Sequence, residues 1–293
     1  MAQTSLQSLE AFRPQPFVKW AGGKSQLVER LAVLAPKRFV RYIEPFVGGG
    51  AFFFYLRPVR ALISDANFEL INSYRVIKND LQSLQGELKS ISNVPLTPSL
   101  FRRFRDIDPD SLSTVRRAAR FIFLNKTCFN GLYRVNKLGK FNVPFGKYSH
   151  MPTLYNEDNL KQVSRLLQST EIMCSNFEIA LEKARSGDFI YLDPPYAVNP
   201  ISPSFTSFTS EGFTEPDQRN LAKKFGELNK RGCYLMLSNS ETKLTRELYA
   251  EYPRIPVSVN RMINCVGKKR TGFRELVILN YHTSSGLDRW IIH

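Results

Sequence analysis

The stretch RYIEPFVGGGAFFFYL, residues 41–56, places three consecutive glycines between two apolar runs. The run before the glycines is typical of a buried strand, and the run after them predicts a helix. Glycines at such a turn let a ligand approach the backbone closely, beside the N–H groups of the helix. This order of elements predicts an α/β fold whose binding crevice begins at the turn. Glu44 is an unusual charge inside the strand and lies beside the same crevice.

Short apolar runs and helical periodicity alternate along most of the chain. Further strands are predicted at ALIS (61–64), EIMC (171–174), FIYL (189–192), CYLML (233–237), near Val257 and at LVILN (276–280). Helices are predicted at ELINSYRVI (69–77), TVRRAARFIFLN (114–125), NLKQVSRLLQ (159–168), after Phe177 and from Thr214, with Asp217 in its first turn. This alternation predicts a doubly wound, mostly parallel, Rossmann-like sheet.

One basic segment interrupts the alternation. FNGLYRVNKLGKFNVPFGKY, residues 129–148, mixes aromatic and basic residues with glycine and proline breaks, which indicates a hairpin or an extended loop. We therefore predict a discontinuous domain of residues 1–66 and 151–293. An inserted domain, mainly helical with a β-hairpin, is expected at residues 67–150.

The charge balance points to an acidic partner. The chain has 41 Lys and Arg against 26 Asp and Glu, a formal charge of +15. A phosphate backbone is the partner that such an excess favours, the alternative being a basic surface with no specific ligand. Four scattered cysteines suit a reducing compartment, and the expected location is the cytoplasm. We expect no metal site, no secretory signal and no membrane helix.

The glycine turn does not fit the common phosphate-binding motifs. A GxGxxG fingerprint that starts at Gly48 needs glycine at position 53, which is Phe53, and AGGKS lacks the P-loop glycine at Val18. Asp65 ends the second strand, where such folds place an acid for ribose hydroxyls. An adenosine-bearing ligand without a pyrophosphate fits these features, and S-adenosylmethionine is one whose sulfonium also favours nearby carboxylates. The alternative for Glu44 and Asp65 is a role in structural hydrogen bonds.

A second motif follows the strand FIYL. Asp193-Pro194-Pro195-Tyr196 offers a carboxylate, a carbonyl of restricted direction and an aromatic face. An exocyclic amine of a nucleobase is a poor nucleophile, because its lone pair is delocalised into the ring. Two fixed acceptors, the Asp193 carboxylate and the Pro194 carbonyl, would localise that pair by binding both N–H groups. Tyr196 would stack on an extruded base.

The chain resembles the Dam-type (D12 class) DNA adenine-N6 methyltransferases over nearly its full length. The resemblance rests on five segments in the family's order: FVKWAGGKSQL, YIEPFVGGGAFFF, SDANFELINSY, FNGLYRVNKLGKFNVPFGKY and FIYLDPPY. It implies that the catalytic loop is Asp193 to Tyr196. The residues implied to bind or line the S-adenosylmethionine site are Trp20, Lys24, Glu44, Pro45, Phe46, Gly48, Gly50, Asp65, Asn176, Phe177 and Asp193.

Several side chains of residues 129–148 suit the reading of bases in a DNA groove. Arg134 would fork onto guanine, Asn130 can donate and accept, and Leu132 and Pro144 offer contact to a thymine methyl. Phe129 would wedge between bases. The resemblance implies that this hairpin enters DNA and that GATC is the target. Arg116, Arg117 and Arg120 are either phosphate contacts or a solvated helix face.

The sequence thus predicts an enzyme that flips adenine out of duplex DNA and methylates N6 by direct transfer. Methylation of cytosine N4 or of RNA adenine is an alternative with the same amine chemistry, and a silent DNA-binding regulator is another. We expect a monomer. The sequence leaves open whether a restriction endonuclease accompanies it, and whether residues 198–213 order over the flipped base or form a plain connection.

Overall fold

A computed structural model describes residues 13–22, 24–136, 138–195, 213–258 and 274–283. Its centre is a seven-stranded sheet with the order β3-β2-β1-β4-β5-β7-β6. The strands are β1 Tyr42–Glu44, β2 Ala61–Asp65, β3 Thr170–Cys174, β4 Phe189–Leu192, β5 Tyr234–Ser240, β6 Arg254–Ser258 and β7 Arg274–Leu279. The strands β1 to β5 pair in parallel, and β7 is antiparallel to both β5 and β6. The predicted Rossmann-like fold class is confirmed.

The helices are α2 Val28–Leu34, α3 Ala51–Leu56, α4 Phe68–Asn79, α5 Leu81–Ser92, α6 Pro98–Asp106, α7 Thr114–Thr127, α8 Glu157–Leu167, α9 Phe177–Glu182, α10 Glu215–Lys230 and α11 Lys243–Leu248. The predicted start of α10 is confirmed, since Thr214 and Asp217 form a capping box in which the Thr214 N–H donates to Asp217 over 2.7 Å. The sequence did not predict α6. Pro98 lies in the first turn of α6, where a missing N–H costs little.

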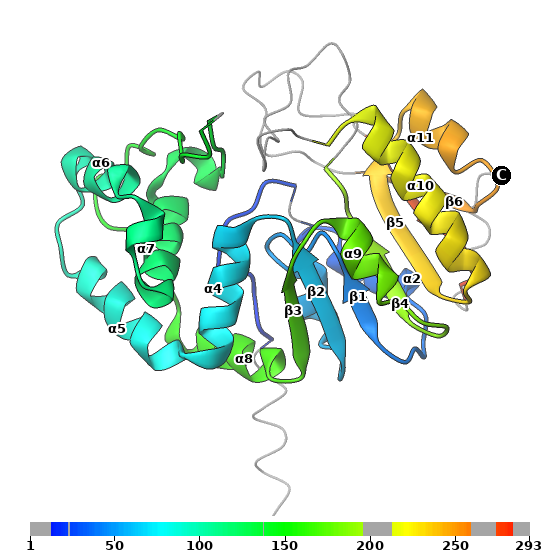
Figure 1. Cartoon of the computed structure of the whole chain (residues 1–293), viewed down its shortest axis with the longest axis horizontal. Helices are drawn as coiled ribbons and strands as arrows, with labels where there is room; N and C mark the ends of the chain where they lie inside the picture. The colour runs from blue at the N-terminus through cyan, green and yellow to red at the C-terminus, as the bar shows by residue number, and fades with distance from the viewer. Residues whose placement is uncertain (1–12, 23, 137, 196–212, 259–273, 284–293) are drawn as a thin grey trace, which may run out of the picture.

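The two faces of the sheet pack on different helices. Ile43, Leu62 and Ile190 join a core cluster with α9 and α10, which lie in front of the sheet in Figure 1. Their chain neighbours Tyr42 and Phe189 point to the other face, into a cluster with α2 and α3. Because both faces are buried, these strands begin with consecutive apolar residues rather than an alternating pattern, and polar residues appear only at their carboxyl ends.

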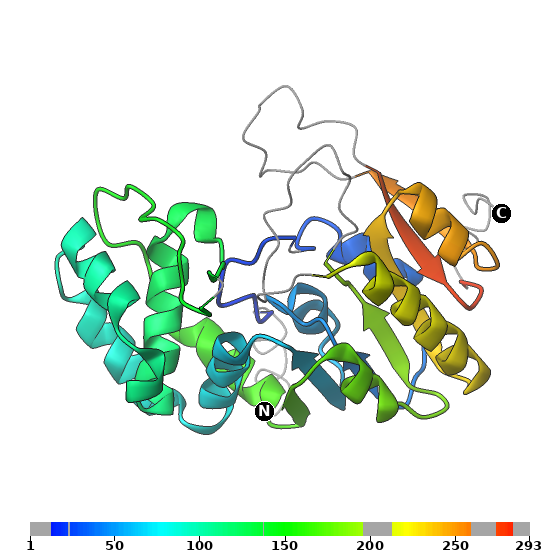
Figure 2. The ribbon, with the colours of Figure 1, turned by 45° about the horizontal axis from the view of Figure 1, so that its top comes forward.

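Helices α5, α6 and α7 form a lobe beside the β3 edge of the sheet, with α4 between them (Figure 1). In Figure 2 the dark-blue segment of residues 13–22 passes between this lobe and the sheet. Asn125 of α7 binds both the N–H and the carbonyl of Lys19 in this segment, over 2.8 and 2.7 Å. One hydrophobic core runs from the sheet into the lobe. The division of the chain at residues 67 and 150 remains a prediction.

The predicted hairpin of residues 129–148 is present in an irregular form. Two isolated antiparallel bridges join Cys128 to Phe145 and Val135 to Phe141. Asn142 donates its N–H to the Arg134 carbonyl over 3.0 Å. The first residues of the hairpin form a short 3₁₀ turn, η2 Phe129–Gly131. The hairpin therefore begins directly after α7, which ends at Thr127.

Candidate active site

The glycine turn after β1 brings the backbone against the N-terminal segment. Gly48 and Gly50 have positive φ values of 48° and 71°, which favour glycine. A Cβ at Gly48 would lie 2.6 Å from Cδ1 of Trp20, and one at Gly50 would lie 2.6 Å from the Tyr74 hydroxyl. The turn therefore requires glycine for space as well as for conformation, and Trp20 covers it.

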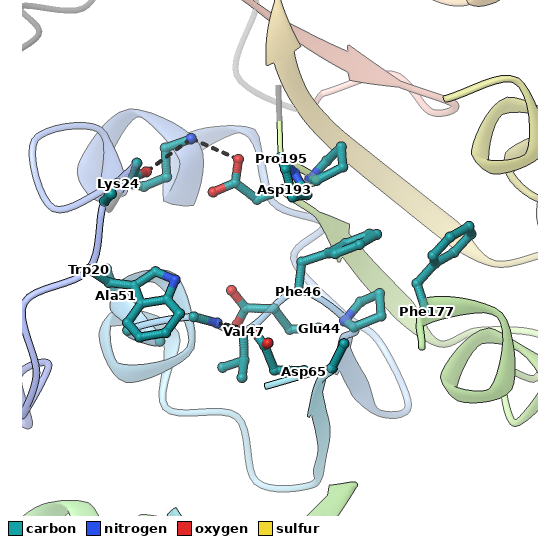
Figure 3. Close-up of a pocket in the computed structure, with 18 of the residues that line it drawn as sticks. Trp20, Lys24, Glu44, Phe46, Val47, Ala51, Asp65, Phe177, Asp193 and Pro195 are labelled. Carbon is teal, nitrogen blue, oxygen red and sulfur yellow. Dashed lines mark hydrogen bonds and ion pairs between the residues drawn. The ribbon is translucent and has the colours of Figure 1, made fainter. Parts of the chain in front are cut away.

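A cavity of about 920 Å³ opens at the carboxyl ends of β1, β2 and β4. All the predicted cofactor residues line it, from five separate parts of the chain: Trp20, Lys24, Glu44, Pro45, Phe46, Gly48, Gly50, Asp65, Asn176, Phe177 and Asp193. Pro194 and Pro195 line it as well, and Figure 3 shows how the carboxylates and aromatic rings face it. Tyr196 and residues 198–212 lie outside the described residues. The volume lies in the range of small-molecule and cofactor sites.

Asp65 organises the glycine turn. One of its oxygens accepts the N–H of Gly48 over 3.1 Å, and the other accepts the N–H of Asn67 over 2.9 Å. The structural hydrogen bonds that the sequence left open are thus present. A carboxylate oxygen can accept more than one hydrogen bond, and the predicted contact with a ribose remains a prediction. Burial raises the pKa of Asp65 to about 6.

Asp193 is held by a buried cation. Its Oδ1 lies 2.7 Å from Nζ of Lys24, and both side chains are largely shielded from solvent. The second carboxylate near Lys24 is Glu275 of β7, with Oε2 at 3.8 Å. Burial raises the pKa of Asp193 to about 6, and Lys24 opposes the increase. The sequence analysis missed Glu275, although a charge within the apolar run RELVIL was a usable signal.

Glu44 adds a further buried carboxylate to the cavity. Its Oε2 accepts a hydrogen bond from the Tyr42 hydroxyl over 2.9 Å, and its pKa is raised by burial. Asp193 and Asp65 add to this effect through charge repulsion. Lys24 is the cation that counteracts the repulsion. The cavity therefore gathers these three carboxyl groups, and a cationic ligand would stabilise their ionised forms.

An aromatic wall closes one side of the cavity. Phe46 and Phe177 stack with ring centroids 5.4 Å apart, and Phe213 meets Phe46 edge-on at 5.7 Å. Asn176 caps α9, because its Oδ1 accepts the N–H of Ile179 over 3.2 Å. This wall offers flat apolar surface to a planar ring system.

The hairpin residues lie at different distances from this cavity. Asn130 lines it and has a positive φ of 54°, an uncommon conformation for a residue other than glycine. Phe129 is 45% exposed. Arg134 is held along the hairpin, where its Nε donates to Oδ1 of Asn142 over 2.8 Å. Leu132 is half-buried and Pro144 is exposed.

The three arginines of α7 differ from one another. Arg116 is exposed and pairs with Glu87 over 3.2 Å. Arg117 is bound between Glu69 and Asp110, 2.6 Å from an oxygen of each. Arg120 is 5% exposed and donates to backbone carbonyls at the end of α6, so the expectation of a phosphate contact or a solvated face was wrong for this residue.

The fold and the site together define a class of protein. A parallel sheet with an antiparallel seventh strand, a glycine turn under a charged cavity and an Asp-Pro-Pro loop beside it are the features of a Rossmann-like methyltransferase. None of the described helices combines the length and apolar character needed to cross a membrane. Among the described residues, no cluster of His, Cys, Asp or Glu is suited to hold a metal ion.

Comparison with known proteins gives the family. Residues 20–263 match the D12 class N6 adenine-specific DNA methyltransferase family. The chain is 44% identical to the type II methyltransferase M.MjaIII of Methanocaldococcus jannaschii, over 91% of this chain and 99% of that protein. It is 33% identical to the DNA adenine methylase of Haemophilus influenzae (95% and 98% covered) and 32% identical to that of Escherichia coli K12 (90% and 94% covered). The chain belongs to the D12 class of N6 adenine-specific DNA methyltransferases, and its substrate is therefore DNA.

Proposed function

We propose that this enzyme transfers a methyl group from S-adenosylmethionine to adenine N6 within GATC, after flipping the adenine out of the duplex. Transfer is direct, without a covalent enzyme intermediate, and the enzyme acts as a cytoplasmic monomer. The observation that carries the proposal is the Asp193 carboxylate, fixed beside two prolines in a cavity that also contains the glycine turn. Two type II methyltransferases among the relatives motivate a further element, a restriction endonuclease as partner.

The residues of the cavity fit S-adenosylmethionine. Gly48 and Gly50 line the cavity and carry no side chain, so a ligand on the cavity side can approach their backbone closely. Glu44 and Asp65 are carboxyl groups whose ionised forms a cationic ligand would stabilise, and Phe46 and Phe177 supply an apolar wall for adenine. When bound, this cofactor supplies an electrophilic methyl group on a sulfonium.

The chain's own residues would prepare the adenine amine. Oδ1 of Asp193 is engaged by Lys24, which leaves Oδ2 to accept one N–H of the amine. The Pro194 carbonyl would accept the other N–H, so that the nitrogen lone pair is turned out of conjugation with the ring. The methylated nitrogen must lose a proton, and the Asp193 carboxylate is the base in contact with it.

The rate of methyl transfer should depend on the protonation of Asp193. Only its carboxylate form accepts the amine N–H, and its pKa is about 6. We expect the single-turnover rate at saturating cofactor to rise about tenfold per pH unit below pH 6 and to level off near pH 7. A rate that stays flat between pH 5 and pH 7 contradicts this role.

Loss of folding would not explain a decreased rate at low pH. Burial raises the pKa of Asp193 and Asp65 from 3.8 to about 6, so the folded protein binds more protons than the unfolded chain between these values. Their contribution to the free energy of unfolding is complete below about pH 4 and decreases as the pH rises through 6. Circular dichroism at each pH provides the control.

Labelled cofactor and defined duplexes test the proposed reaction. We expect label on adenine in a duplex with one GATC and about background label when the site is changed to GTAC. Label on cytosine, or on RNA alone, would contradict the proposal. Mass spectrometry of the digested product identifies the methylated base.

Arg134 should contribute sequence specificity. Its guanidinium lies along the hairpin, where it donates to the side-chain oxygen and the carbonyl of Asn142. We expect Arg134→Ala to cost about 1–3 kcal/mol on GATC and to relax preference at one base pair. Arg116→Ala is the comparison: loss of this exposed α7 arginine should weaken binding to all duplexes equally and reduce its salt dependence. Equal losses on all sequences for Arg134→Ala would make it a phosphate contact.

A further inference from the structure

Two buried amides connect the catalytic loop to the core of the sheet. Gln218 of α10 is 2% exposed and Asn239 of β5 is 0% exposed. Gln218 donates through Nε2 to the Pro195 carbonyl over 3.1 Å, and Asn239 donates through Nδ2 to Oε1 of Gln218 over 3.0 Å. Oδ1 of Asn239 in turn accepts the N–H of Ser240 over 2.8 Å. We call this chain of three hydrogen bonds the amide relay.

The direction of the amide relay is fixed at both ends. A backbone N–H at Ser240 can only donate, and a carbonyl at Pro195 can only accept. Asn239 must therefore turn its oxygen to Ser240 and its amino group to Gln218, and Gln218 must turn its amino group to Pro195. Because every amide has one orientation that satisfies both neighbours, the relay holds a single arrangement.

The relay restrains a torsion that the two prolines leave open. Each pyrrolidine ring fixes its own φ, and Pro195 restricts ψ of Pro194 because a residue before proline avoids the helical region. The ψ of Pro195 has no such restraint from its own ring. The hydrogen bond from Gln218 to the Pro195 carbonyl fixes the peptide plane that ψ orients.

We infer that Gln218 and Asn239 are positioning residues for methyl transfer, which hold the Asp193–Pro195 backbone in its reactive arrangement without touching the substrate. This inference rests on the proposed role of Asp193 and Pro194. It requires that loss of the relay lowers the rate of the chemical step and leaves the binding of both substrates nearly unchanged. A displacement of about 1 Å at a reacting group can cost about 100-fold in rate.

The first variant is Gln218→Met, which keeps the length of the side chain and removes the donor. We expect its single-turnover rate with labelled S-adenosylmethionine and a GATC duplex to fall about 10- to 100-fold. The Kd values for cofactor and DNA should change less than about threefold. Gln168→Met is the control, because Gln168 also donates to a backbone carbonyl, that of Lys78 over 2.8 Å, but lies at the amino end of β3, whereas Pro195 follows the carboxyl end of the parallel strand β4. The control should keep the wild-type rate.

The second variant tests the relay itself. Asn239→Asp has no donor for Gln218, so the Gln218 amino group turns toward the new carboxylate and its oxygen meets the Pro195 carbonyl. We expect a loss of rate at least as large as that of Gln218→Met. The double variant should be no slower than Asn239→Asp, because the methionine removes the misdirected oxygen.

Two outcomes would overturn the inference: a wild-type rate in Gln218→Met, or effects of the two variants that multiply in the double variant. Thermal melting of each variant shows which fraction is folded, and rates are compared per folded enzyme. Asp193→Asn is measured in the same assay. If it stays active, the proposed role of Asp193 is at fault. If Asp193→Asn is inactive while Gln218→Met keeps the wild-type rate, the role of Asp193 stands and only the inference about the amide relay is refuted.

Discussion

Replacing Asp193 by asparagine should lower methyl transfer at least about 10³-fold, because the variant points a donor at the amine that it must hold. Nζ of Lys24 carries only donors and lies 2.7 Å from Oδ1 of Asp193. The single oxygen of the asparagine therefore turns to Lys24, and its amino group faces the cavity. The adenine N–H then meets a second donor. Single-turnover incorporation of labelled methyl groups measures the loss.

DNA affinity should survive this substitution. The phosphate contacts of the basic surface do not involve the Asp193 carboxylate, so Kd in a fluorescence assay should change only a few-fold. The matched control is Asp188→Asn, at the opposite end of β4, where Asp188 binds Arg41 over 2.9 Å. This variant should melt at a lower temperature and keep its rate per folded enzyme. More than about a tenth of wild-type activity in Asp193→Asn would refute the mechanism.

The features that the sequence predicted are those with short-range causes. Apolar runs such as FIYL, the glycines after β1 and the prolines after Asp193 restrict the local backbone, so their positions could be located without the fold. The same applies to the start of α10, where Thr214 and Asp217 are three residues apart. Strand order is different. That β7 inserts between β5 and β6 depends on pairing over long distances in the chain.

The residues that the sequence analysis missed act through distant partners. Glu275 is separated from Lys24 by almost the whole chain, and Gln218 reaches Pro195 across the segment between β4 and α10. Arg120 has the same local sequence context as Arg116 and Arg117, yet only Arg120 is buried against α6. Local periodicity places all three on one helix but does not show which side of it a neighbouring helix covers.

Gly86 provides the control for a glycine-to-alanine substitution in the turn after β1, because Gly86 has neither a positive φ nor a close neighbour. It lies within α5, and a Cβ added there meets nothing within 4 Å. Gly86→Ala should raise the free energy of unfolding by about 0.5–1 kcal/mol, since alanine loses less conformational freedom in a helix. The affinity for S-adenosylmethionine should not change.

The same substitution at Gly48 should weaken cofactor binding by about 10- to 100-fold. The new Cβ would lie 2.6 Å from Cδ1 and 2.8 Å from Nε1 of Trp20, so the indole must move from its place at the cavity. Alanine at a φ of 48° also adds strain of about 1–2 kcal/mol to the turn whose N–H binds Asp65. Isothermal titration with S-adenosylmethionine measures the affinity. The melting temperature without cofactor measures how much the strain destabilises the fold. An affinity in Gly48→Ala equal to that in Gly86→Ala would show that the ligand does not lie against this turn.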